Sequence, residues 1–290
     1  MIVDDSARVG VDVGGTTTRA VAFDASLSSL AIESAPTPHG AIPIARRVAE
    51  LVDALRGPAT SATRSASIAV CMPGRVDVAT GTVADAVNLG IDAPVDMGAL
   101  LADALGAPVQ LENDVNAAAL GTFHHLGLDA RSSLAYINVG TGIAAGFVLA
   151  GRMWRGSTGG AGEIGHIPMR ADGPPCPCGQ VGCAEAIGSG RAVGHDPQRR
   201  ADVLAAVAWT VQLCALTLDV DLVAIGGGLT EIGQPFMDAL DARLAERETA
   251  SPFLASAGLR RRVRLAPAGT PLGAAGAVLA ARAASAERAR

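Results

Sequence analysis

The stretch VDVGGTTTRAVAF (residues 11–23) decides the fold predicted for this chain, because it reads as two short strands joined by a glycine turn. A second stretch, INVGTGIAAGFVL (residues 137–149), repeats the order of apolar strand, Gly/Thr turn and apolar strand. Apolar runs bounded by glycine are typical of hairpins. The repetition indicates two related halves, each opening on an antiparallel hairpin.

Outside these stretches, segments with helical spacing of apolar residues alternate with short apolar runs. Helices are expected at 42–56, 97–105, 115–126, 201–218, 229–246 and 274–282, and further strands at 67–71, 109–111, 222–225 and 263–266. This alternation predicts an α/β fold. The longest apolar segment, residues 203–218, is shorter than the ~20 residues that a membrane span needs, so a buried helix is expected there.

The composition is typical of a globular protein and excludes several classes of enzyme. Hydrophobic residues make up 49% of the 290 residues, and the net charge of −5 argues against a general nucleic-acid binder. All 23 basic residues are arginine. Without lysine the chain cannot be a P-loop NTPase, a protein kinase or a pyridoxal-phosphate enzyme. The first residues, MIVDD, carry acids where a signal peptide carries bases, so a cytoplasmic protein without membrane attachment is expected.

The two glycine turns are candidate phosphate sites. Consecutive Gly14 and Gly15 let backbone N–H groups approach an anion closely, and the threonines that follow add hydroxyl donors. Asp12 stands at the end of the preceding strand, where its carboxylate suits a metal ion or its waters. Either turn alone could be an ordinary hairpin. Together, one in each half, they fit two clamps on one polyphosphate.

Three polar residues, Glu112, Asn113 and Asp114, follow an apolar strand and open an alanine-rich helix. Asn113 or Asp114 could be the helix N-cap, which would explain one residue but not the cluster. An aspartate in this position can accept a proton from a substrate hydroxyl. Asparagine has both a donor and an acceptor, so it suits a neutral polyol.

The spacing His166-x9-Cys176-x-Cys178-x4-Cys183 lies in a Gly- and Pro-rich region. Three thiolates and one imidazole are the ligands of a closed, tetrahedral, structural Zn²⁺ site. Reduced cysteines in a loop, or a reversible disulfide, are the other interpretations. Cys71 and Cys214 lie in apolar segments, where we expect buried packing residues.

Two glutamates flank this cysteine region, Glu163 before His166 and Glu185 after Cys183. Each could be a solvated loop charge, or the metal could hold both in place to accept hydrogen bonds from a ligand. Gly227 and Gly228 follow a later strand, where small residues let a flat ring or a ribose lie against the backbone, although helix packing would also favour them.

In their order along the chain, these motifs resemble the ROK family of sugar kinases and sugar-responsive repressors, within the actin-like ATPase superfamily. The matching motifs are DVGGTTTR (12–19), MPGRVD (72–77), ENDVNAAALG (112–121), NVGTGIAAG (138–146), GEIGH (162–166), CPCGQVGCAE (176–185) and AIGGGL (224–229). They cover most of the chain, and the combination of GEIGH with the cysteines is highly specific.

The resemblance implies a two-domain actin-like ATPase (ribonuclease-H-like) fold with an interdomain cleft and a zinc-stapled loop. The small domain would comprise residues 1–114 and a C-terminal helix at about 274–290, and the large domain residues 115–273. ATP and Mg²⁺ would supply the phosphoryl group, a hexose would accept it, and Zn²⁺ would be structural. A homodimer or homotetramer is expected.

The resemblance also implies a role for individual residues. Asp114 would be the general base on the 6-hydroxyl of the sugar. The other hydroxyls would be bound by Asn88, Asn113, Glu163, His166 and Glu185, with His166 serving both zinc and sugar. Mg²⁺ and the phosphates would be held by Asp12, Gly14, Gly15, Thr16, Thr17, Thr141 and Gly142. Gly227 and Gly228 would border the adenosine.

Glucose is the acceptor expected first, and N-acetylglucosamine, N-acetylmannosamine, fructose, or polyphosphate as donor, remain alternatives. The chain departs from the usual pattern at Ala144 and Ala184, and residues 190–200 look shorter than in the family. A sugar-sensing regulator is the alternative of another class. Such repressors carry an N-terminal helix-turn-helix domain, and about seven residues before the first expected strand leave no room for one.

Overall fold

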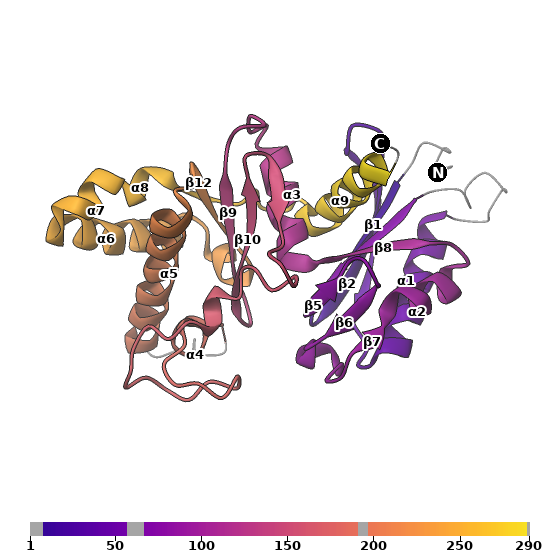
Figure 1. Ribbon diagram of the computed structural model, residues 1–290, viewed down its shortest axis with the longest axis horizontal. Helices are drawn as coiled ribbons and strands as arrows, with labels where there is room; N and C mark the ends of the chain where they lie inside the picture. The colour runs from indigo at the N-terminus through magenta and orange to yellow at the C-terminus, as the bar shows by residue number, and fades with distance from the viewer. Residues whose placement is uncertain (1–7, 57–66, 191–196, 289–290) are drawn as a thin grey trace. The chain divides into compact units, whose positions relative to one another are not determined.

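The computed structural model describes residues 8–56, 67–190 and 197–288. Most of the segment that looks shortened in the sequence, 190–200, and the last two residues of the predicted C-terminal helix segment lie outside this description. The described chain divides into two compact units (Figure 1). Unit 1 comprises residues up to Gly121 together with Gly156–Gly160 and the segment from Pro271, and unit 2 comprises Thr122–Arg155 and Ala161–Thr270.

Unit 1 is built on a five-stranded mixed sheet of order β3-β2-β1-β4-β8. Strand β2 runs antiparallel to both β1 and β3, whereas β4 and β8 run parallel to β1. The strands are β1 (Arg8–Val13), β2 (Thr17–Phe23), β3 (Ser29–Pro36), β4 (Ile68–Met72) and β8 (Val109–Asn113).

Helices cover both faces of this sheet. One apolar cluster joins the sheet to the helices α1 (Ala41–Arg56) and α2 (Met97–Leu105). A second cluster joins Phe23 and Cys71 of the sheet to α3 (Asp114–His125) and α9 (Leu272–Arg288). A small antiparallel sheet of β5 (Arg75–Asp77), β6 (Thr82–Ala84) and β7 (Val95–Asp96) and the short helix η2 (Val87–Leu89) complete the unit.

Unit 2 repeats the same sheet. Its order is β11-β10-β9-β12-β13, again with an antiparallel hairpin at one side and two strands parallel to β9 at the other. The strands are β9 (Leu134–Val139), β10 (Ile143–Leu149), β11 (Arg152–Trp154), β12 (Leu222–Gly226) and β13 (Val263–Leu265). The shared order and strand directions confirm that the two halves are related in architecture.

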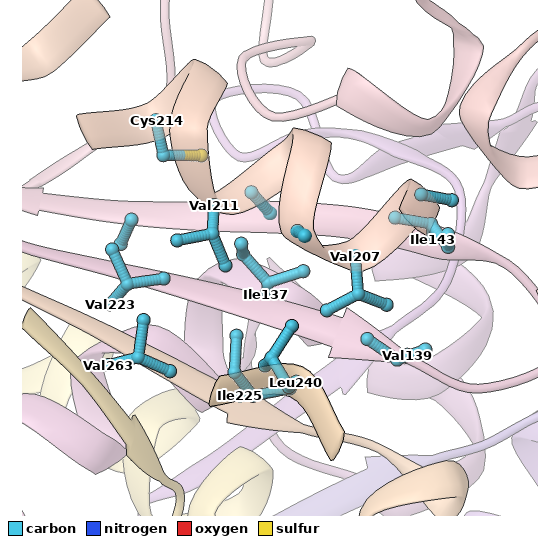
Figure 2. Packing of buried hydrophobic residues seen from close by; sticks show 14 of the residues in the cluster. Ile137, Val139, Ile143, Val207, Val211, Cys214, Val223, Ile225, Leu240 and Val263 are labelled. Carbon is cyan, nitrogen blue, oxygen red and sulfur yellow. The ribbon is translucent and has the colours of Figure 1, made fainter. Parts of the chain in front are cut away.

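The core of unit 2 lies between this sheet and helix α5 (Pro197–Leu218). Figure 2 shows Val207, Val211 and Cys214 of this helix above the strands that carry Ile137 and Val223. Residues 200–218 are long and apolar enough to cross a membrane by length and composition, and 44% of that window is buried inside the unit. Because residues along its length, from Val203 to Ala215, belong to the buried apolar cluster, α5 is a core helix, as the sequence predicts.

The remaining elements of unit 2 are short helices and α6. They are η3 (Ile164–His166), α4 (Ala184–Gly188), η4 (Gly228–Ile232), α6 (Gln234–Ala250), α7 (Pro252–Ala257) and α8 (Leu259–Arg262). The single helix expected over 229–246 is wrong, because Gly233 separates η4 from α6 with a positive φ of 73°. The strands β3, β5, β6, β7 and β11 were not expected from the sequence.

Candidate active site

The first candidate phosphate turn joins β1 to β2. The N–H of Gly14 donates to the carbonyl of Thr17 at 3.0 Å, which closes the turn. Gly15, Thr16 and Thr17 are exposed. Thr37, at the end of the neighbouring strand, donates its hydroxyl to the carbonyl of Gly14 at 2.8 Å. The hydroxyl of Thr37 thus fixes the buried side of the turn, and the exposed backbone and hydroxyls of the turn can contact a ligand.

Asp12 lies at the end of β1, partly buried beside this turn. Burial raises the pKa of its carboxyl, and the charge of Arg19 and a hydrogen bond from Cys71 offset part of the rise. A Cβ on Gly273 would lie 2.6 Å from Oδ2 of Asp12, so the first turn of α9 passes directly against the carboxylate. A poorly solvated carboxylate of this kind is a suitable partner for a divalent cation.

Cys71 connects Asp12 to the end of β8. In the register of the sheet, Asp12 pairs with Cys71 and Cys71 pairs with Glu112. Burial raises the pKa of Cys71 well above its usual range, and the charges of Asp12, Asp114 and Glu112 raise it further. These carboxyl groups therefore gather around one buried thiol. The prediction that Cys71 and Cys214 are buried is confirmed, at 0% and 2% exposure, but Cys71 also hydrogen-bonds Asp12.

Asn113 ends β8 and caps helix α3. Its Oδ1 accepts from the N–H groups of Val115 and Asn116, both at 3.0 Å, and its Nδ2 donates to the carbonyl of Gly74 at 3.0 Å. The capping interpretation of Asn113 is therefore correct. Its role in binding a sugar stays a prediction.

Asp114 is the first residue of α3, and its Oδ1 accepts from the N–H of Val115 at 2.9 Å. The N-terminus of a helix favours a negative charge at this position. Glu112 is buried, at 2% exposure, and accepts from the N–H of Asn113 at 3.0 Å. Glu112 was not selected from the sequence, although its position in the Glu-Asn-Asp cluster could have indicated it.

Asn88, the remaining sugar-contact residue predicted in unit 1, lies in η2 and is exposed. A Cβ on Gly15 would lie 3.9 Å from the Cβ of Asn88. The carbonyl of Leu89, which follows Asn88, accepts from the N–H of Gly40 at 2.7 Å. The structure therefore places Asn88 beside the first candidate phosphate turn.

The second candidate phosphate turn joins β9 to β10. The N–H of Gly140 donates to the carbonyl of Gly142 at 3.0 Å. The N–H of Ile143 donates to Oε2 of Glu185 at 3.0 Å. Thr141 is exposed at the tip of the turn. Glu185, expected from the sequence to bind a ligand hydroxyl, is thus also attached to this turn.

The cysteines and His166 form one compact cluster. The four ligand atoms all lie within 4.8 Å of one another. Sγ of Cys178 lies 3.7 Å from Sγ of Cys183, and Sγ of Cys176 lies 3.6 Å from Nδ1 of His166. Tetrahedral zinc, with Zn–S of about 2.3 Å and Zn–N of about 2.1 Å, needs S···S of about 3.8 Å and S···N of about 3.6 Å. The cluster therefore fits Zn²⁺.

The thiols of this cluster differ in acidity. Hydrogen bonds from the backbone and side chain of Gln180 lower the pKa of Cys178 to about 6. Burial raises the pKa of Cys183 to about 12. A metal ion would have to displace the proton of the more buried thiol, so its affinity should increase with pH.

His166 faces the cluster with Nδ1 and turns Nε2 toward the exposed Glu163, 4.0 Å from its Oε2. A carboxylate near the second nitrogen of a metal-binding histidine orients the ring. Glu163 and the ring edge of His166 therefore lie together at the surface of unit 2, where both can contact a ligand.

Gly227 and Gly228 follow β12. Gly227 has a φ of 91°, and a Cβ there would lie 2.7 Å from Oδ1 of Asn138. A Cβ on Gly228 would meet no atom within 4 Å. Gly227 is thus required by packing, whereas the space beside Gly228 is open to a ligand.

Comparisons with known proteins give the family. Residues 8–212 match the ROK family. The N-acetylmannosamine kinase of Citrobacter koseri is 34% identical over 200 residues, which cover 66% of this chain and 64% of that protein. The matched region thus spans less than two thirds of this relative.

Solved structures resemble the whole chain. The ROK hexokinase of Thermus thermophilus is 29% identical with a TM-score of 0.75, and covers 97% of this chain and 99% of its own. A ROK family glucokinase from Streptomyces griseus, in complex with glucose and AMPPNP, is 25% identical with a TM-score of 0.78, and covers 96% of this chain and 99% of its own. The predicted α/β fold of the actin-like ATPases is confirmed, and the chain belongs to the ROK family.

Proposed function

We propose that this protein is an ATP-dependent sugar kinase that transfers the γ-phosphoryl group of ATP to the 6-hydroxyl of a hexose. The observation that carries the proposal is the position of Asp114. Its carboxylate stands at the first turn of α3, in the same unit as the threonine-rich turn and Asp12. A base, a phosphate turn and a candidate cation ligand on one sheet are the parts that phosphoryl transfer to an alcohol needs.

On the acceptor side, Asp114 would take the proton of the 6-hydroxyl while that oxygen attacks the γ-phosphorus. The bond from the γ-phosphorus to the β–γ bridging oxygen would break, and ADP would leave. The residues proposed to bind the remaining hydroxyls offer amide, carboxylate and imidazole groups, and they are Asn88, Asn113, Glu163, His166 and Glu185. Water could attack the γ-phosphorus in place of the sugar, so the bound sugar must displace water from Asp114 to limit hydrolysis of ATP.

On the donor side, the chain holds the phosphates without lysine. The groups proposed to bind the phosphates are backbone N–H groups and hydroxyls at Gly14, Gly15, Thr16, Thr17, Thr141 and Gly142, and Gly227 and Gly228 are proposed to border the adenosine. Mg²⁺ bound with ATP neutralises phosphate charge. Asp12 suits this cation, because burial has already removed much of the water that would otherwise stabilise its carboxylate.

Zn²⁺ is proposed as a structural ion at His166, Cys176, Cys178 and Cys183. A closed set of four protein ligands leaves no position for a substrate. Elemental analysis should find about one zinc per chain. A metal-free preparation that is stable and fully active would contradict the structural role.

The acceptor is proposed to be glucose, the ligand named in the Streptomyces griseus glucokinase structure. N-acetylmannosamine is a second candidate, because the Citrobacter koseri relative with 34% identity is named for that sugar. An ADP-release assay over glucose, N-acetylmannosamine, N-acetylglucosamine and fructose decides between them, with polyphosphate as a second donor. A regulator would bind a sugar and release no ADP.

Asp114→Asn tests the mechanism. The amide keeps the size of the side chain but cannot take a proton, so we expect sugar binding to be retained and kcat to fall by about 10²–10⁴-fold. Asp103→Asn, at an exposed carboxylate of α2, is the matched control and should keep the kcat of the wild type. A near-normal kcat for Asp114→Asn would overturn the assignment of the base.

The protein is further proposed to be cytoplasmic and to form a homodimer or homotetramer, without nucleic-acid or membrane partners. Light scattering coupled to size exclusion measures the mass in solution. A monomer of 29.0 kDa at micromolar concentration would contradict the oligomer.

A further inference from the structure

We propose that Glu185 is a positioning residue for the proposed phosphate turn Gly140–Ile143. Through this residue, binding of the sugar would raise the affinity of the turn for nucleotide. The inference rests on the proposed kinase function and adds to it a link between the two substrates. It starts from a contact that the sequence does not reveal, since Glu185 and Ile143 are 42 residues apart.

The carboxylate of Glu185 is fitted against the turn. Its Oε2 accepts from the N–H of Ile143 at 3.0 Å, and within the described residues this is the one hydrogen bond that the carboxylate makes. A Cβ on Gly142 would collide with Oε2 and would lie 3.1 Å from Cδ of Glu185. The glycine therefore leaves room for the carboxylate, and the carboxylate fixes the backbone at the end of the turn.

The segment that carries Glu185 holds the turn at a second point. The N–H of Gly190, which follows α4, donates to the carbonyl of Gly140 at 2.6 Å. Gly140 in turn donates to the carbonyl of Gly142 at 3.0 Å. Both ends of the turn are thus attached to the same short segment, residues 185–190.

The residues that directly precede this segment contact the cysteine cluster and the region of the proposed sugar-binding histidine. Cys183 immediately precedes α4, and its Sγ lies 3.4 Å from the carbonyl of His166. The N–H of Ala184 donates to the carbonyl of Ile167 at 3.2 Å. A continuous path of bonded atoms therefore runs from the proposed sugar-binding histidine to the proposed phosphate turn.

The second carboxylate oxygen of Glu185, Oε1, is the atom through which a bound sugar would affect the turn. A hydroxyl that donates to Oε1 would restrict the carboxylate and, through Oε2, the N–H of Ile143. A turn that is already ordered binds the phosphates with a smaller loss of entropy. Occupancy by the sugar should therefore raise nucleotide affinity, and by linkage nucleotide should raise sugar affinity by the same factor.

Two measurements on the full chain test the inference. Hydrogen exchange of the peptide that contains Ile143 reports the turn directly and does not require any kinase activity. Calorimetric titration with Mg²⁺–AMPPNP reports nucleotide affinity. The variants are Glu185→Ala, Glu185→Gln, Gly142→Ala and the double variant Glu185→Ala/Gly142→Ala. The matched control is Glu246→Ala, at an exposed glutamate of α6 in unit 2.

We expect Glu185→Ala to accelerate exchange at the turn and to weaken Mg²⁺–AMPPNP binding about tenfold, the usual size of a lost hydrogen bond to a charged group. Glu185→Gln keeps an acceptor for Ile143 and should bind nucleotide within about threefold of the wild type, as should the control. Gly142→Ala displaces the carboxylate, so it should weaken binding in the wild type and add little in the Glu185→Ala background.

Unchanged exchange at Ile143 in Glu185→Ala would overturn the inference, as would additive losses in the double variant. Tighter nucleotide binding by Glu185→Ala would also overturn it, because the carboxylate would then act only by repelling phosphate. Failure of the wild type to bind Mg²⁺–AMPPNP would count against the kinase function itself, and the exchange measurement would still decide whether Glu185 positions the turn.

Discussion

At the scale of single residues, Asp12 shows how unit 1 is prepared for a charged ligand at a cost in stability. Burial raises the pKa of its carboxyl, and the hydrogen bond from Cys71 and the charge of Arg19 offset only part of this. The cross-strand row of Asp12, Cys71 and Glu112 concentrates further negative charge nearby. Clustered carboxylates lower the stability of the fold unless a cation neutralises them, so this arrangement is typical of a cation site.

Asp12→Asn should therefore raise the stability of the protein at neutral pH and abolish its response to Mg²⁺–nucleotide. A carboxyl whose folded pKa is raised stabilises the fold below its ordinary pKa of 3.8 and loses that contribution as pH rises through the folded pKa. At pH 7 the buried carboxyl of Asp12 is therefore destabilising, and asparagine removes this effect. The gain in Tm should disappear at acid pH, where the wild type is protonated.

Dye-based differential scanning fluorimetry measures both effects, with Tm compared at pH 7 and pH 3 and the Mg²⁺–AMPPNP shift compared at pH 7. Asp103→Asn, at an exposed carboxylate, should change neither Tm nor the nucleotide shift. A lower Tm for Asp12→Asn at pH 7 would show that the carboxylate is satisfied in the folded state and has no need of a cation.

At the scale of elements, the sequence predicts what local chemistry determines. The hairpins were predicted from alternating apolar residues and glycine turns, and the cysteine cluster from its spacing. The sequence does not predict strand β3, because its side chains are largely exposed and show no apolar periodicity. It does not predict the break at Gly233, because helical spacing continues across it. The contact of Glu185 with Gly142 depends on tertiary packing, which spacing along the chain does not encode.

Helix α9 provides a prediction at this scale, because glycine allows it to pack closely. A Cβ on Gly276 would collide with the backbone carbonyl of Ala117 in α3. Gly276→Ala should therefore destabilise unit 1 by about 1–3 kcal/mol, the usual effect of overpacking, despite the better helix propensity of alanine. Urea unfolding measures the free energy, with Ala283→Ser at an exposed position of the same helix as control. A stability equal to that of the wild type would mean that α9 moves away without loss.

At the scale of the whole molecule, one sheet topology is used twice with different additions. Each unit has its own apolar core. Unit 1 carries the proposed base, and unit 2 carries the candidate metal cluster next to the segment that contacts its proposed phosphate turn. The absence of lysine from the sequence is consistent with the proposed function, because the glycine turn of each unit offers N–H groups in place of the ammonium group that P-loop enzymes and protein kinases use.

The aromatic residues make the two units separable by experiment. The two tryptophans, Trp154 and Trp209, and the one tyrosine, Tyr136, all lie in unit 2. Intrinsic fluorescence therefore follows the unfolding of unit 2, whereas far-UV circular dichroism follows the helices and strands of both units.

If zinc stabilises only the loop of unit 2, a chelator such as 1,10-phenanthroline should lower the midpoint of the fluorescence transition by several degrees, since loss of a structural metal removes binding free energy from that fold. The dichroism curve should broaden, because unit 1 keeps its own core. Asp12→Asn should do the reverse and shift the dichroism curve upward with little change in fluorescence. Equal shifts of both signals after chelation would show that the two cores unfold as one cooperative system, and no shift of either would show that the cysteine cluster holds no structural metal.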